Sequence, residues 1–122
     1  MAESLSGLKR TMMCGEPREE HVGKKITLMG WVQRNRKLGG LQFIDLRDRT
    51  GIMQVVFGDD VTEEVFEKAK GVRPEYCIAV TGEVVLREAP NKELPTGLVE
   101  LKCEDIRILS ESETPPIYIK EG

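Results

Sequence analysis

The stretch KITLMGWVQRNRKLGGLQFIDLRDRTGIMQVVF, residues 25–57, decides the fold that the sequence predicts. Along residues 25–36 the apolar side chains recur at every second position, as on a strand with one buried face. Two glycine-containing turns separate this segment from a second strand over 41–48 and a third over 52–57. Gly30, inside the first strand, indicates a bend or a close approach of another backbone. The stretch therefore predicts a meander of three antiparallel strands.

One short amphipathic helix is predicted after the meander. Apolar residues recur at helical spacing over residues 61–69, with Asp59 or Asp60 as the N-cap and Gly71 as the C-cap. Alternation returns in two further strands, over residues 76–88 and 98–109. The order predicts an all-β chain with one short helix, namely an OB-fold, a five-stranded Greek-key barrel whose helix lies between strands three and four. A β-sandwich is the alternative, but it does not predict a helix at that position.

The size and composition favour one domain and a binding module. The chain has 122 residues, of which 39% are hydrophobic and 32% charged, enough for a core but little for a complete enzyme. We expect an N-terminal extension over 1–20, the OB-fold over 21–110 and a linker over 111–122, where Pro115 and Pro116 stand. The sequence shows neither a long apolar run nor a secretory leader, so we expect no membrane contact and a cytoplasmic location.

Positive charge is concentrated in one part of an acidic chain. The net charge is −3, yet residues 24–49 carry seven positive and two negative side chains. Such a patch predicts contact with phosphates, or alternatively a solvated face balanced by Asp45 and Asp48. We expect those two carboxylates to pair with the flanking arginines in a turn rather than to act as an acid and a base. The positive residues are Lys24, Lys25, Arg34, Arg36, Lys37, Arg47 and Arg49.

Metal and catalytic motifs are not found in the sequence. Cys14, Cys77 and Cys103 are far apart and are expected to be reduced thiols, and His21 is expected at a turn before the first strand. No hydrolase elbow, phosphate-binding loop or dinucleotide fingerprint can be written from the chain. We expect this chain to hold no cofactor and to catalyse no reaction by itself.

Strand alternation places a set of polar and aromatic side chains on one outward face. If the residues on either side of them point inward, then Phe43, Gln54 and Glu100 point outward on neighbouring strands. Arg36 and Arg87, near strand ends, border the same surface. A ring, an amide, a carboxylate and arginines suit the reading of single-stranded bases. The alternative is that Phe43 is a core residue and the polar side chains are merely solvated.

Five segments of the chain resemble a known family. They are RTMMCGE (10–16), HVGKKITLMGWVQRNRKLGGLQFIDLRDRTGIMQVVF (21–57), VTGEVVLRE (80–88), PTGLVE (95–100) and TPP (114–116). Together they resemble the N-terminal anticodon-binding domain of bacterial-type aspartyl-tRNA synthetases, in the group that also holds the asparaginyl and lysyl enzymes. The resemblance covers nearly the whole chain, and residues 43–57 are similar to the bacterial aspartyl enzymes in particular.

The resemblance implies roles for individual residues. Phe43 matches the phenylalanine that stacks on the middle anticodon base, a uridine, and Gln54 matches the glutamine that hydrogen-bonds it. Arg36 matches an arginine near the third base, and Glu100 matches a glutamate at the guanine-type first base. The loop after the fourth strand would bring Arg87 and Asn91 to the anticodon. Val85 stands where the family can have an arginine.

The resemblance also implies a larger enzyme. Aspartyl-tRNA synthetases bind tRNA(Asp), form homodimers and carry ATP and magnesium in a catalytic domain, which we expect to lie outside this chain. We expect the chain to be a domain of such an aspartate-tRNA ligase. The alternatives are an asparaginyl or lysyl type of anticodon domain, a general single-strand-binding OB protein, and a protein-interaction domain. Whether the chain is a fragment or a stand-alone module, and whether it separates aspartate tRNA from asparagine tRNA, stay open.

Overall fold

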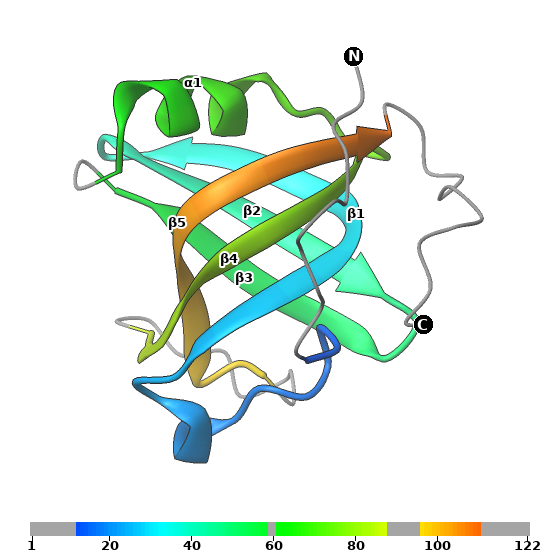
Figure 1. Cartoon of the computed structure of the whole chain (residues 1–122), viewed down its shortest axis with the longest axis vertical. Coiled ribbons are helices and arrows are strands. Elements are labelled where there is room, and N and C mark those ends of the chain that lie inside the picture. Colours follow the sequence, from blue (N-terminus) through cyan, green and yellow to red (C-terminus); the bar gives the residue numbers. More distant parts are fainter. Residues whose placement is uncertain (1–11, 59–60, 88–95, 111–122) are drawn as a thin grey trace.

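A closed barrel of five strands forms the body of the protein in the computed structural model, which describes residues 12–58, 61–87 and 96–110. The strands are β1 (Lys25–Leu38), β2 (Leu41–Asp48), β3 (Gly51–Phe57), β4 (Cys77–Leu86) and β5 (Val99–Ser110). Around the barrel they follow the order β1-β2-β3-β5-β4, with β3 parallel to β5 and the other neighbours antiparallel (Figure 1). The predicted OB-fold is confirmed, and a β-sandwich is excluded.

Inward side chains of all five strands fill the barrel. Residues at alternate positions of β2, β3 and β5 are at most 1% exposed, while their outward neighbours are partly or fully exposed, except for Val56, which is 8% exposed. The alternation therefore has the parity that the sequence predicts. The buried set on these three strands is Ile44, Leu46, Met53, Val55, Phe57, Val99, Leu101 and Cys103.

The helix α1 (Glu63–Gly71) lies between β3 and β4 in the chain and covers one end of the barrel (Figure 1). Its N-cap is Thr62, whose side chain accepts a hydrogen bond from the backbone of Val65. The predicted caps Asp59 and Asp60 are therefore wrong, and both lie outside the described residues. At the other end, the Asn35 amide donates to the carbonyls of Ala69 and Val72, which fixes the last turn of α1 to β1.

The first half of β1 is buried on both faces, which the sequence did not predict. Met29, expected on the outward face, is 6% exposed. It belongs to a second apolar cluster with residues of β4 and β5, against which Trp31 also packs. Alternation in the sequence indicates only which side chains face the main core. The outer cluster therefore corrects the prediction that this strand is buried on one face alone. Its buried members are Met29, Cys77, Ala79 and Leu109.

Residues that precede β1 are attached to the turn between β2 and β3. The backbone N–H of Cys14 donates to the buried Asp48 carboxylate at 2.7 Å, and that of Gly15 donates to the Thr50 hydroxyl at 2.8 Å. Burial alone would raise the pKa of Asp48, but hydrogen bonds from Thr50 and Cys14 outweigh it and lower the pKa. The expected pairing of Asp48 with its flanking arginines is therefore wrong. The boundary of the extension at residue 20 stays a prediction.

The structure agrees with what the sequence predicts for the cysteines and for His21. All three cysteines are free thiols and are buried. His21 ends the 3-10 helix η1 (Glu19–His21), where its Nδ1 accepts from the backbone N–H of Arg18. Within the described ranges, His, Cys, Asp and Glu side chains form no group of three that could hold a metal ion. In the same ranges, no helix is long and apolar enough to cross a membrane.

Alkaline pH is expected to destabilise the fold through Cys103. Burial raises the pKa of this thiol from its ordinary value of 9.0 to about 12. Between these values the unfolded chain loses the thiol proton while the folded chain keeps it, so the free energy of unfolding falls by up to about 1.4 kcal/mol per pH unit. Urea unfolding of the protein and of Cys103→Ala at pH 8 to 11 measures this: the stability advantage of the native cysteine should shrink as pH rises. An advantage independent of pH would contradict the raised pKa.

Candidate nucleic-acid interface

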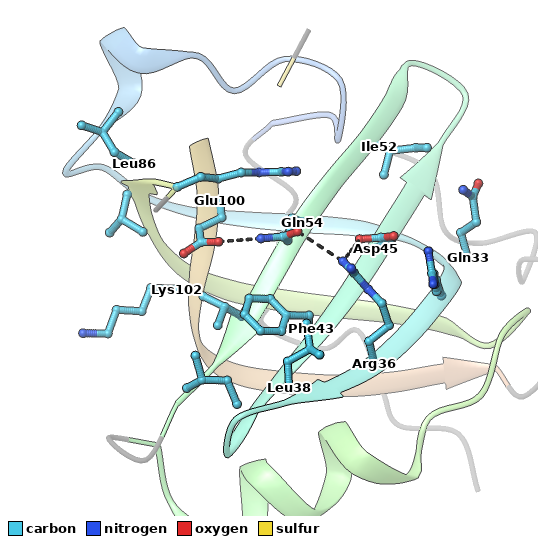
Figure 2. A pocket seen from close by; sticks show the side chains of 15 residues that line it. Gln33, Arg36, Leu38, Phe43, Asp45, Ile52, Gln54, Leu86, Glu100 and Lys102 are labelled. Atoms are coloured by element: carbon cyan, nitrogen blue, oxygen red, sulfur yellow. Dashed lines mark hydrogen bonds and ion pairs between the residues drawn. The ribbon is translucent and has the colours of Figure 1, made fainter. Parts of the chain in front are cut away.

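A pocket of about 780 Å³ opens on the outer face of the barrel and is lined by residues of all five strands (Figure 2). Four predicted site residues, one on each of β1, β2, β3 and β5, lie side by side in its lining: Arg36, Phe43, Gln54 and Glu100. Arg34 and Arg87 line it as well. The structure therefore brings six of the residues singled out from the sequence into one cavity. Asn91 lies outside the described residues.

A β-bulge in β1 turns the arginines toward this pocket. Up to Val32, which pairs with Leu46, the even-numbered residues of β1 face the core. The register shifts between Val32 and Arg34, so that Arg34 pairs with Asp45 and Arg36 with Phe43, both outward positions. A bulge inserts one residue and so reverses which side chains face outward. Without it, the alternation of β1 would direct both arginines into the barrel.

Phe43 is a surface ring and not a core residue. It is partly exposed, whereas its neighbour Ile44 is fully buried. The guanidinium of Arg36 lies 5.9 Å from the ring centroid. The rest of the ring faces the cavity near its centre (Figure 2). An exposed ring in a concave site offers a platform on which a nucleobase can stack.

A chain of four polar side chains crosses the floor of the pocket (Figure 2). The Gln54 amide nitrogen donates to Glu100 Oε1 at 2.7 Å, and the amide oxygen accepts from Arg36 Nη2 at 3.3 Å. The same Arg36 nitrogen lies 3.3 Å from Asp45 Oδ1. The amide, the carboxylate and the guanidinium are thus held in place before any ligand arrives, which lowers the entropy cost of binding.

Arg87 borders the pocket beside Glu100. Its Nε donates to the carbonyl of Val99 at 3.1 Å. Burial lowers its pKa, and the charge of Arg36 adds to this, while Glu100 and Asp45 oppose it. An arginine nevertheless stays protonated at neutral pH, so Arg87 is a fixed positive charge. Val85 faces Glu100 across β4 and β5, which makes that part of the lining apolar.

The basic segment of the sequence is divided in the structure. Of the seven positive residues within 24–49, Arg34 and Arg36 line the pocket. The others lie outside it and are exposed: Lys24, Lys25, Lys37, Arg47 and Arg49. Arg47 donates to the side chain of Gln33 at 2.8 Å. Among the described residues, four cationic and two anionic side chains line the cavity, so this part of the lining is positive although the chain as a whole is negative. The cationic ones are Arg34, Arg36, Arg87 and Lys102.

Sequence reasoning missed two charged residues of the lining, Asp45 and Lys102. Each shares its strand's outward parity with a predicted residue, Phe43 and Glu100 respectively, and that signal was available. The prediction that Asp45 pairs with the flanking Arg47 and Arg49 is wrong, because it pairs with Arg36. Three exposed leucines also line the rim and offer apolar surface to bases: Leu38, Leu41 and Leu86.

Comparison with known proteins agrees with this geometry. Residues 26–109 match the tRNA anticodon family of OB-fold nucleic acid binding domains. The chain belongs to this family. The match begins at the second residue of β1 and extends nearly to the end of β5, so this OB-fold domain includes every described residue that lines the pocket.

Curated relatives of high sequence identity to this chain are aspartate-tRNA ligases. The chain is 81% identical over 122 residues to the enzyme of Clostridium botulinum (strain Alaska E43 / Type E3), covering 100% of the chain and 20% of that protein. It spans about a fifth of the length of such relatives. Among solved structures, asparaginyl-tRNA synthetase from Pyrococcus horikoshii is 36% identical with a TM-score of 0.70, over 81% of this chain and 23% of that one. Aspartyl tRNA synthetase from Entamoeba histolytica, 24% identical over 91% of this chain and 23% of that one, shares the fold with a TM-score of 0.75.

Proposed function

We propose that this OB-fold domain is the anticodon-binding part of an aspartate-tRNA ligase and that it binds the anticodon loop of tRNA(Asp). The observation that carries the proposal is the pocket in which the Phe43 ring, the Gln54 amide and the Glu100 carboxylate lie together. The identity of 81% to aspartate-tRNA ligases supports it. Curated relatives from 70% to 81% identical are aspartate-tRNA ligases, which favours the aspartyl type over the asparaginyl type.

Each side chain suits one part of a single-stranded loop. A base stacks on Phe43, and the Gln54 amide both donates to and accepts from its edge. Glu100 accepts from the N1–H and N2–H groups of guanine at the first position. Arg36 serves the third base, and Arg34, Arg87 and Lys102 contact phosphates or base edges. Asn91 belongs to the proposal through the resemblance alone.

The remaining parts of the proposal concern the parent enzyme. We place ATP, magnesium and the attachment of aspartate in a catalytic domain outside these 122 residues, in a cytoplasmic homodimer. The relatives, about five times as long as this chain, support that division. This domain would contribute binding energy remote from the reaction, which orients the tRNA for charging. It would hold no cofactor itself.

RNA titration tests the proposal. The chain is expected to bind a stem-loop whose loop presents guanosine, uridine and cytidine in order, at least about tenfold more tightly than one with these bases scrambled. Affinity should fall steeply with salt, because arginine and lysine contacts to phosphates release counterions. Fluorescence anisotropy at two salt concentrations measures both effects.

Two other outcomes would favour the alternative functions. Equal affinity for both loops would contradict the proposal and support a general single-strand binder. Binding to neither loop would support a protein-interaction domain.

A further inference from the structure

The Arg36–Asp45 pair stands at one end of the polar chain in the pocket. Asp45 has 20% of its side chain exposed and Arg36 31%, so the pair is only partly screened by water. Arg36 Nε is buried without a hydrogen-bond partner, so Asp45 and the Gln54 oxygen are the acceptors that hold this guanidinium in the described structure. Removing Asp45 would therefore take away the only negative charge that these contacts place against Arg36.

Arg36 in turn fixes which way the Gln54 amide faces. The amide oxygen lies toward the Arg36 cation and the amide nitrogen toward the Glu100 carboxylate (Figure 2). The reverse orientation would place an N–H against a guanidinium and an oxygen against a carboxylate. Both contacts are repulsive, so the two flanking charges select one orientation.

We propose that Asp45 is a positioning residue that, by anchoring Arg36, locks the Gln54 amide and makes the pocket select uracil over cytosine. This rests on the proposed function, in which Gln54 reads the base stacked on Phe43. It adds a specificity role for a carboxylate that does not itself contact the base. Asp45 on β2 lies opposite Gln54 on β3, so both side chains lie on the same outer surface as Arg36.

Uracil and cytosine present opposite patterns to a locked amide. Uracil offers N3–H as a donor and O4 as an acceptor, whereas cytosine offers N3 as an acceptor and its N4 amino group as a donor. In one stacked pose, the amide oxygen accepts from uracil N3–H while the amide nitrogen donates to O4. Cytosine in that pose pairs only if the amide turns over, against both flanking charges. Once Asp45 no longer anchors Arg36, the Gln54 amide can turn over at a lower energy cost, so cytosine is rejected less strongly.

The test compares stem-loops that differ only in uridine or cytidine at the middle position. The 122-residue chain is expected to prefer uridine about tenfold or more, and Asp45→Asn to reduce that preference to about threefold or less. Asp45→Glu, which keeps the charge, should restore part of it. Asp105→Asn, the same change at an exposed position of β5 outside the pocket, should leave it unchanged. The ratio of the two affinities is the readout, since a merely structural role would weaken both.

Arg36→Met provides an independent arm if Asp45→Asn unfolds. It removes the guanidinium through which Asp45 acts, so it should lower the uridine preference equally, and adding Asp45→Asn to it should change the ratio no further. A full preference in Asp45→Asn or in Arg36→Met would overturn the inference while leaving the proposed function standing. If the unmodified chain failed to prefer either loop to a scrambled one, the proposed function would fail and the inference with it.

Discussion

Replacing Gly30 with alanine is expected to lower the free energy of unfolding by about 3 kcal/mol or more. A Cβ at this position of β1 would lie only 2.2 Å from the carbonyl oxygen of Arg47 and 3.0 Å from its carbonyl carbon. Both atoms belong to the backbone of β2, so no side-chain rotation relieves the overlap and the two strands must separate. The close approach that the sequence predicted at Gly30 is confirmed.

Urea unfolding followed by circular dichroism measures the loss. Gly71→Ala is the matched control, because nothing lies within 4 Å of a Cβ there and its φ is not positive. We expect that change to be neutral or to stabilise the fold by about 0.5 kcal/mol. A Gly30→Ala protein as stable as the control would contradict the strand packing described for β1 and β2.

Phe43→Ala is expected to weaken binding of the anticodon stem-loop by about 1 to 3 kcal/mol, the usual effect of removing a ring on which a base stacks. The melting temperature should change little, because the ring is partly exposed and lies outside the barrel core. Anisotropy titration and thermal unfolding of the same preparation separate the two effects.

Phe43→Tyr and Phe43→Leu are the controls for that result. Tyrosine keeps the ring and should retain nearly all of the affinity, whereas leucine keeps apolar volume without an aromatic face and should lose most of what alanine loses. Unchanged affinity in Phe43→Ala would contradict the proposal that a base stacks on the Phe43 ring. A fall of more than about 10 °C in melting temperature would instead indicate a structural residue.

The main site residues could be predicted because the alternation of apolar and polar residues in the sequence matches the alternation of buried and exposed side chains in the strands. Ile44 is buried and Phe43 is not, and the same holds for Val55 against Gln54. A period of two is a local property of a strand, so it can be extracted from sequence without knowing which strands pair. The succession of strands along the chain and the position of the helix between the third and fourth strands followed from the spacing of these segments.

Features that depend on pairing could not be predicted. The bulge after Val32 depends on how β1 registers against β2, and it decides that Arg34 and Arg36 face the pocket. Local charge patterns made the flanking arginines the expected partners of Asp45, and Arg47, two residues on, does share its outward face of β2. Arg47 nevertheless donates to Gln33, and the partner of Asp45 is Arg36 of the neighbouring strand β1. The basic patch predicted from the sequence included too many residues for a similar reason, because charges that are close in sequence lie on different surfaces of the fold.

Mapping of the RNA contact by NMR tests the central claim most directly. The isotopically labelled chain is titrated with the stem-loop carrying guanosine, uridine and cytidine, and backbone amide shifts are followed residue by residue. We predict the largest changes at Phe43, Gln54 and Glu100, with Met29 and Ala79 on the outer apolar cluster unchanged. Changes concentrated on that cluster, or spread evenly over the barrel, would contradict the assignment of the pocket as the site that reads the anticodon.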